Sequence, residues 1–212
     1  MNKQENRRLF WLLVAFGVLN IAYFVVQRLR DPIVIVHTPV DDWIPFCEWF
    51  AIPYVIWYVY VFAAIVYFFF YERAILCKMA EMIVAGMGVC VLIFAICPNG
   101  IDFRPTSFPR DNLLVDLVRL LYSNDQPENV FPSIHVLNSL AVHMAVHHSK
   151  TLRRYRFVEP TSLVLTILIC LSTVFIKQHS VVDIAGGVVL AVALYLPLYA
   201  RRATDKSAVG NH

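Results

Sequence analysis

The chain has 212 residues, of which 59% are hydrophobic, 14% aromatic and only 16% charged. A soluble domain of this length carries about 25% charged residues, and its one core could not hide so many apolar side chains. These figures exclude soluble, disordered, collagen-like and disulfide-rich proteins, and a net charge of +3 is too small to indicate a nucleic-acid partner. The composition predicts an integral membrane protein with a single all-α domain over residues 1–212.

Six apolar runs approach the roughly 20 residues that a helix needs to cross a bilayer. In chain order the predicted spans are Leu9 to Gln27, Ala51 to Tyr71, Met79 to Cys97, Pro132 to His148, Thr161 to Ile176 and Ser180 to Tyr199. The fourth and fifth are short and carry polar residues. The first has a basic start but no small-residue cleavage site, so we expect it to stay as a helix. The sequence thus predicts a bundle of six transmembrane helices.

Lys and Arg are unevenly shared between the two sides of this bundle. Of the 18, 12 fall on the side of both termini, Arg201, Arg202 and Lys206 among them, and 6 on the other. Because positive charge accumulates on cytoplasmic ends, both termini are predicted to lie in the cytoplasm of a cell-membrane protein. Segments 28–50 and 98–131 and the turn 177–179 then face outward.

Both outward segments are unusual. Residues 31–49 combine tryptophans with acidic side chains, which predicts a piece lying on the outer interface, where Asp41 and Asp42 could contact an acceptor headgroup. Residues 98–131 form a loop of about 34 residues, and long ordered loops are usually functional. The outer face is therefore the first place to look for chemistry.

His179 and Asp183 are four residues apart where the fifth and sixth spans join. On a helix this spacing puts their β-carbons about 5–6 Å apart on one face. The carboxylate can then hold one imidazole nitrogen and leave the other as a nucleophile or base. Ionisable side chains inside a span are costly and usually functional. The structural alternative is a histidine and an aspartate that only satisfy each other at a helix start.

Pro132, Ser133 and His135 begin the fourth span. The free N–H groups of this first turn, with the Ser133 hydroxyl, would face an anion at the positive end of the helix dipole. His135 is placed to give a proton to a leaving group. Arg104 and Lys177 supply fixed positive charge nearby. A helix cap, a solvated histidine and basic side chains reaching the headgroups would explain these residues without chemistry.

The clusters at 97–105, 131–135 and 177–183 together resemble the three motifs of the type-2 phosphatidic acid phosphatase superfamily, which includes lipid phosphatases and lipid-headgroup phosphotransferases. The matching residues are Arg104 and Pro105 in the first motif, Pro132, Ser133 and His135 in the second, and Ser172, His179 and Asp183 in the third. Lys177-Gln178-His179 and residues 41–46 look closer to the branch of inositol-phosphorylceramide and sphingomyelin synthase-like proteins. The chain departs from the family at Cys97, Ile134 and Thr173, where the motifs have Lys, Gly and Arg.

The resemblance implies an enzyme that uses neither a metal nor a cofactor and acts on a phosphorylated lipid at the outer face. His179 would attack phosphorus to give a phosphohistidine, Asp183 would orient it, and His135 would protonate the leaving oxygen. The phosphate-binding residues would be Arg104, Ser133 and Lys177. Water, or the hydroxyl of an acceptor lipid, would then take the phosphoryl group.

Several functions stay open at this point. A phosphatase of phosphomonoester or diphosphate lipids and a headgroup phosphotransferase share the same first step. A polyprenyl diphosphate phosphatase fits the same motifs, whereas a non-catalytic lipid-binding protein is favoured only by the missing Lys and Arg. His143, His147 and His148 could ligate a metal from one helix face, but they fall near the cytoplasmic end. We interpret them as interfacial and predict no metal site.

Overall fold

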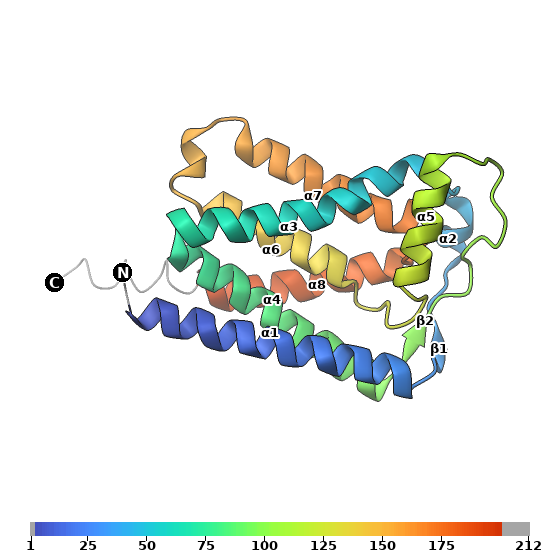
Figure 1. The fold of residues 1–212 in the computed structure, drawn as a ribbon, viewed down its shortest axis with the longest axis horizontal. Helices are drawn as coiled ribbons and strands as arrows, with labels where there is room; N and C mark the ends of the chain where they lie inside the picture. Colours follow the sequence, from blue (N-terminus) through green and yellow to red (C-terminus); the bar gives the residue numbers. More distant parts are fainter. Residues whose placement is uncertain (1–2, 201–212) are drawn as a thin grey trace.

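The computed structural model describes residues 3–200, and it is an all-α bundle (Figure 1). Its long helices are α1 (Lys3–Leu29), α3 (Ala51–Tyr71), α4 (Arg73–Ile96), α6 (Ile134–His148), α7 (Val158–Phe175) and α8 (Val181–Tyr195). The shorter elements are β1 (Val34–Ile35), α2 (Pro39–Trp43), β2 (Asn99–Gly100), α5 (Leu113–Asn124), two 3₁₀ turns at Glu48–Phe50 and Leu152–Arg154, and a π turn at Leu196–Ala200. β1 and β2 pair in parallel, with Val34 opposite Asn99.

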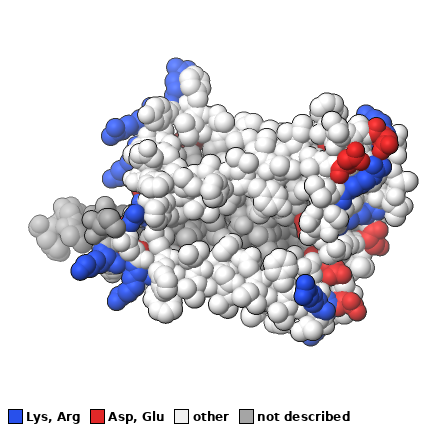
Figure 2. Space-filling model, viewed as in Figure 1, with Lys and Arg blue, Asp and Glu red and all other residues white. Residues whose placement is uncertain are grey.

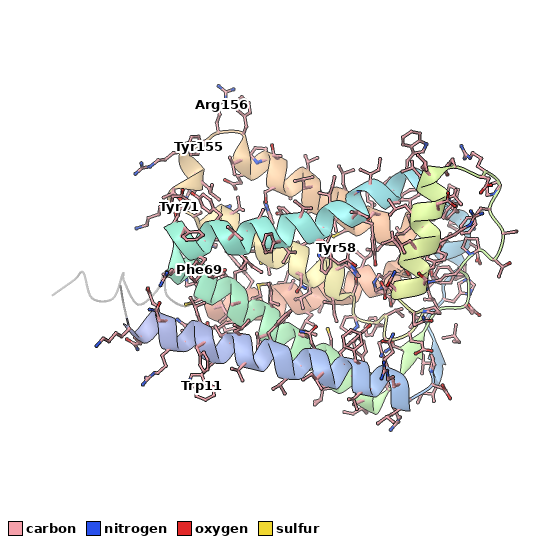
Figure 3. All side chains as sticks on the ribbon, viewed as in Figure 1. Trp11, Tyr58, Phe69, Tyr71, Tyr155 and Arg156 are labelled. Carbon is pink, nitrogen blue, oxygen red and sulfur yellow. The ribbon has the colours of Figure 1, made fainter. Side chains whose placement is uncertain are left out.

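Five helices are long and apolar enough to cross a membrane, namely α1, α3, α4, α7 and α8. They confirm the predicted all-α, multi-pass class. The outer surface of α1 suits lipid, since Trp11 projects away from the bundle (Figure 3). The remaining predicted span, 132–148, becomes α6, whose 15 residues rise about 22 Å, less than the roughly 30 Å of a hydrocarbon core. The structure therefore has five candidate spans among its described residues, where the sequence predicted six.

α6 is the central helix, with α3, α4, α7 and α8 packed against it. It starts beside α8, where the Ser133 N–H donates to the Asp183 carbonyl at 3.1 Å. It ends beside the α3–α4 turn, where Ser149 Oγ and the Thr151 N–H donate to Glu72 Oε1 at 2.9 and 2.7 Å. Because its neighbours shield it from lipid, α6 needs no apolar surface all round, which explains why its sequence signal is weak.

A glycine sets the closest approach between α6 and α8. A Cβ placed on Gly187 would lie 2.9 Å from the Ser133 carbonyl oxygen and 2.9 Å from Val136 Cβ. Without a side chain there, the second turn of α8 packs directly on the first turn of α6. This contact brings the residues just before α8 next to His135.

The loop 98–131 contains a helix that the sequence analysis missed. α5 lies across one end of the bundle (Figure 1). Asn112 caps it by accepting two backbone N–H bonds at 3.0 Å. Val118 and Leu121 pack with Ala51 and Tyr54 of α3 in a small hydrophobic cluster. The predicted functional loop is therefore an ordered cover over this end of the bundle.

Charge is distributed unequally between the two ends (Figure 2). Lys and Arg dominate the end that holds the start of α1 and the α3–α4 and α6–α7 turns. Acidic side chains gather, with further basic ones, at the end that carries α2 and α5. Arg201, Arg202 and Lys206, which belong to the larger basic group in the sequence, lie outside the described residues.

Candidate active site

His179 and Asp183 meet at the start of α8, and both are buried. His179 Nδ1 lies 3.2 Å from Asp183 Oδ2. The predicted pairing is present, but His179 precedes the helix, so the contact does not arise from one helical face. Asp183 instead reaches back as the third residue of a capping box, where Oδ2 also accepts the N–H of Ser180 at 2.9 Å. The same carboxylate thus starts the helix and holds the imidazole.

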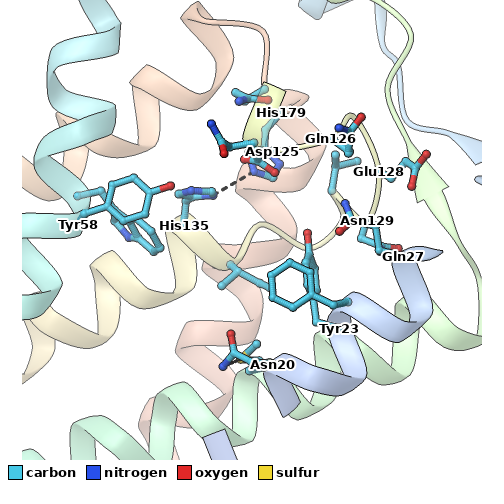
Figure 4. Close-up of a pocket in the computed structure, with 17 residues that line it drawn as sticks. Asn20, Tyr23, Gln27, Tyr58, Asp125, Gln126, Glu128, Asn129, His135 and His179 are labelled. Carbon is cyan, nitrogen blue, oxygen red and sulfur yellow. Dashed lines mark hydrogen bonds between the residues drawn. The ribbon is translucent and has the colours of Figure 1, made fainter. Parts of the chain in front are cut away.

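The second histidine completes a chain of three side chains, and its contact with His179 is the dashed line in Figure 4. His135 Nδ1 lies 3.4 Å from His179 Nε2. The His135 ring is held between the rings of Tyr54 and Trp57 on α3, at centroid distances of 4.8 and 4.4 Å. Asp183, His179 and His135 therefore form a continuous polar chain from α8 to α6, with each histidine fixed by its own element.

A pocket of about 260 Å³ opens at the two histidines. Figure 4 shows it between α1, which contributes Tyr23 and Asn20, and α3, which contributes Tyr58. The segment 124–130 after α5 forms another wall. The three predicted catalytic residues thus lie in or directly behind one concave site, formed at the end of the bundle that α5 covers.

Two buried amides in this pocket have donors without a partner. Gln178 is 1% exposed and Asn129 is 6% exposed, and both line the pocket. Gln178 Nε2 and Asn129 Nδ2 find no hydrogen-bond partner among the described residues. A buried unsatisfied donor costs about 1–3 kcal/mol, and a ligand that brings acceptor oxygens would remove this cost. Neither residue was a predicted phosphate ligand. The only sequence feature that could have indicated them is their position, next to or near the motif residues His179 and Pro132.

Arg104 stands behind Gln178 instead of in the pocket wall. Its guanidinium donates to Gln178 Oε1 and, at 2.7 Å, to the Asp125 carbonyl, and it lies 4.7 Å over the Tyr122 ring. Burial lowers the pKa of Arg104. Because Gln178 Oε1 faces this cation, its amide nitrogen is the end that points toward a ligand. The charge of Arg104 therefore reaches the pocket through Gln178.

Lys177 is not brought to the histidines. Its Nζ donates to the carbonyl oxygens of Asp41 at 2.6 Å and Ile44 at 2.5 Å, and it lies 5.5 Å over the Phe103 ring. Its backbone is left-handed, with φ at 55°. Burial lowers the pKa of this ammonium group. In the structure Lys177 fastens the α2 segment to the turn before His179 and does not line the pocket.

Ser133 caps α6, and its hydroxyl accepts the N–H of Val136 at 3.4 Å. The residues that reach the pocket from this first turn are Ile134 and His135. Their N–H groups have no intrahelical acceptor, and they lie at the positive end of the helix dipole. Ser133 therefore organises the anion-attracting end of α6 more than it faces the pocket.

Asp41 is a buried residue of the site whose role the sequence did not indicate. Its carboxylate accepts the Ser180 hydroxyl at 2.7 Å and the Val181 N–H at 2.9 Å. Burial raises the pKa of Asp41, but these bonds and those from Thr38 outweigh that effect, so the pKa lies below its usual range. The ionised Asp41 thus binds the first turn of α8. The sequence analysis considered Asp41 as a contact to an acceptor headgroup, but in the structure both of its carboxylate oxygens bind the start of α8.

Asn99 is a second residue of this kind. Its Oδ1 accepts the N–H groups of Val130 and Phe131 at 2.9 and 2.8 Å, and its Nδ2 donates to the Cys97 and Phe131 carbonyls at 3.1 Å. One buried side chain therefore positions the segment that leads into α6. A small polar residue between Pro98 and Gly100 was the only signal in the sequence.

No protein-family model matches the chain, and no curated protein matches it. The three positions that depart from the resembled motifs lie close to the site. The Thr173 carbonyl accepts the N–H groups of Gln178 and His179 at 2.8 and 3.0 Å, a role of the backbone that any residue type can fill. Ile134 lines the pocket, and Cys97 is the C-cap residue that follows α4.

The pocket wall formed by the segment after α5 is acidic. Asp125 and Glu128 line it, and no Lys or Arg is among the lining residues that the structure describes. Asp125 accepts the Tyr54 hydroxyl at 2.7 Å, while burial raises the pKa of Glu128. A hydroxyl or cationic group next to a bound phosphate would suit this wall.

The histidines near the other end of α6 each pair separately. His143 Nδ1 contacts Ser162 Oγ at 3.1 Å, His147 Nδ1 contacts Glu159 at 2.6 Å, and His148 Nε2 contacts the Tyr195 hydroxyl at 2.9 Å. Within residues 3–200, no group of three or more metal-ligating side chains is assembled.

Proposed function

We propose that the chain is a membrane enzyme that removes or transfers the phosphoryl group of a lipid through His179. The observation that carries the proposal is the chain of Asp183, His179 and His135 at a pocket with unpartnered buried donors. His179 Nε2 attacks phosphorus, and the bond from phosphorus to the lipid oxygen breaks. His135 gives its proton to that oxygen, and Asp183 stabilises the charged imidazole through Nδ1.

Several donors are available for the charge that develops on the phosphoryl oxygens. They are the amides of Gln178 and Asn129 and the first-turn N–H groups of α6. Arg104 strengthens this set through Gln178, and Ser133 and Lys177 hold the two backbone segments in place. In the second step water, with His135 as its base, attacks the phosphohistidine and releases inorganic phosphate.

Headgroup transfer is the second candidate, and the acidic wall favours it. Asp125 and Glu128 could bind a hydroxyl-rich or cationic headgroup beside the phosphate. In that reaction the hydroxyl of an acceptor lipid replaces water in the second step. The first step is the same in both candidates.

The proposal includes an orientation in the membrane. α6 would be the sixth crossing, because it runs from the end of the bundle where α8 starts to the end that holds the α3–α4 turn. The excess of Lys and Arg at the latter end supports a cytoplasmic location for it. Both termini would then be cytoplasmic, and the pocket would face the outer leaflet.

The test is phosphate release from phosphatidic acid and from a polyprenyl diphosphate by detergent-purified protein in excess chelator. We expect His179→Ala to lose turnover by about 10⁴-fold or more, since the attacking atom is gone. His147→Ala is the matched control, because His147 pairs with Glu159 away from the pocket and this variant should keep full activity.

Equal release by His179→Ala and wild type would end the assignment. Release from neither substrate would direct the test to transfer onto hydroxylated acceptor lipids. A protein that binds phosphatidic acid but neither releases nor transfers phosphate would support the non-catalytic alternative instead.

A further inference from the structure

A second pocket, of about 560 Å³, lies between α1 and α3 on the side away from α5. Its walls are almost entirely apolar, with Leu13 and Phe16 on α1, Ile65 on α3, and Ile83 and Val84 on α4. Figure 2 shows the face of the molecule hollowed along this line. The mechanism proposed above does not use this space.

The two pockets follow one another along the same four helices. On each helix, a residue that lines the first pocket is followed within about one turn by a residue that lines the second. The pairs, with the residue of the first pocket given first, are Asn20 and Phe16 on α1, Tyr58 and Val61 on α3, Met87 and Val84 on α4, and His135 and Asn138 on α6. The two pockets therefore lie end to end, along a line that runs from the histidines toward the α3–α4 turn, and together they make a groove. We call it the α1–α3 groove.

The α1–α3 groove opens sideways to the surroundings of the bundle. Leu13 at its rim is 69% exposed, whereas Met79 and Ile83 at its floor are buried. α1 packs on α4, which leaves its α3-facing side open. A chain of methylene groups in the bilayer could enter without crossing water. Because lipid is as apolar as these walls, shape and packing would decide what binds.

A polar side chain lies in the apolar lining at the end near the histidines, whereas Asn6 and Arg73 line the opposite end. Asn138 is 7% exposed and its Oδ1 has no hydrogen-bond partner among the described residues. It follows His135 by three residues, about 4.5 Å along α6. An amide oxygen only accepts hydrogen bonds, so a hydroxyl would satisfy it. Asn138 therefore offers an acceptor about one helical turn from the proposed site of phosphoryl transfer.

We infer that the α1–α3 groove binds one hydrocarbon chain of the substrate, and that Asn138 Oδ1 accepts a hydrogen bond from a hydroxyl between that chain and the phosphate. This inference rests on the proposed function, which places the phosphate at His179. The preferred substrate is then a phosphate lipid with a hydroxyl close to phosphorus, such as lysophosphatidic acid. A polyprenyl diphosphate has no such group at this position.

Photolabelling tests the groove independently of catalysis. The probe is phosphatidic acid with a diazirine in its acyl chain, in nanodiscs with protein that carries His179→Ala, so that the lipid is not consumed. Peptides with the groove positions of α1 and α4 should be labelled more than the lipid-facing surface of α7. Val84→Phe, which narrows the junction of the two pockets, should remove this enrichment.

Val89→Phe is the matched control, because Val89 lies on the same helix, is 40% exposed and does not line the groove. Ala80→Phe, deeper in the groove, is the second blocking variant in case Val84→Phe does not fold. Labelling spread evenly over all apolar helices, or unchanged by either blocking variant, would overturn the groove as a binding site.

Turnover separates this inference from the proposed function. Val84→Phe should lose about 10²-fold in kcat/KM for long-chain phosphatidic acid, the cost of a misplaced reactant, and keep its activity toward a water-soluble short-chain analogue. Asn138→Leu should raise KM for lysophosphatidic acid and leave that for its analogue without the free hydroxyl unchanged. Equal effects on both lipids would exclude the Asn138 contact. A wild type without any turnover would refute the proposed function, while the labelling still decides the groove.

Discussion

The imidazole of His179 has a different neighbour at each ring nitrogen. Asp183 holds Nδ1, and His135 lies beside Nε2. A carboxylate at Nδ1 favours the tautomer whose lone pair is on Nε2, the atom that faces the pocket. Around this pair the structure places amides where the sequence suggested cations. The positive charge of Arg104 is one hydrogen bond away from the ligand, which makes Gln178 the residue through which it acts.

Gln178→Leu tests this relay. The substitution removes the donor and leaves Arg104 without its Gln178 partner. A hydrogen bond to a charged group contributes about 1.5–3 kcal/mol, so kcat/KM should fall about 10- to 100-fold. Gln178→Glu should be worse still, because it turns a carboxylate toward the phosphate. Steady-state kinetics with melting temperatures checks both variants, and unchanged kinetics in Gln178→Glu would show that the amide does not face the ligand.

At the scale of elements, the first two turns of α8 are the junction on which the site depends. The α2 segment contacts them through Asp41, α6 packs on them at Gly187, and the turn from α7 delivers His179 to them. The contacts of the α2 segment and of α6 join segments that lie far apart along the chain. Substitutions at this junction should therefore disturb the contact between His179 and His135 although both histidines are still present.

Asp41 makes the stability of this junction pH-dependent. Its pKa is depressed in the folded state, so its carboxylate contributes stability that is fully present above the unfolded value of 3.8. That contribution is lost as the pH falls below 3.8 through the folded pKa. Asp41→Asn should lower the melting temperature near neutral pH, and the difference from wild type should shrink below pH 3.8. A difference that stays constant with pH would show that charge is not involved.

Gly187→Ala tests the contact of α6 with α8. The new methyl group would lie 2.9 Å from the Ser133 carbonyl, so the two helices must move apart. Overpacking of this kind costs about 1–3 kcal/mol. We expect a lower melting temperature and a loss of turnover. Gly17→Ala on α1 is the control, since nothing lies within 4 Å of its added Cβ, and it should be neutral or slightly stabilising.

At the scale of the whole molecule, the histidine pocket and the basic end lie at opposite ends of the bundle. The histidine pocket lies at the end covered by α5, and the groove runs from it toward the basic end. A lipid in the outer leaflet could place its phosphate in the first part and its chain in the second. This arrangement requires that the α5 end faces outward.

Two variants, each with one added cysteine at opposite ends of the bundle, test the orientation. Leu113 on α5 is 86% exposed, and Tyr155 in the α6–α7 turn is 65% exposed. In intact cells Leu113→Cys should react with a membrane-impermeant maleimide, whereas Tyr155→Cys should react only after permeabilisation. Wild type, with its five native cysteines, sets the background. The opposite pattern would invert the topology, and labelling of both positions in intact cells would show that α6 does not separate them across the membrane.

The sequence by itself determined the membrane class, the all-α character and five of the long helices, because apolar run length is a local property of the chain. It also predicted that His179 and Asp183 pair, since they are four residues apart. It did not reveal α5, whose 12 residues are too short and too amphipathic for a hydropathy signal. The sequence did show that the fourth run is short, but not that the helix formed from it, α6, begins only at Ile134 and has 15 residues.

Only the tertiary structure decided which other side chains share the site. His135 meets His179 across 44 residues of sequence, and Arg104 meets Gln178 across 74. Hydrophobic periodicity says which face of a helix is buried, but not which helix it meets or at what height. Those choices follow from the packing of α6 among its neighbours. The packing turned Lys177 away from the pocket and left the α1–α3 groove open beside the histidines.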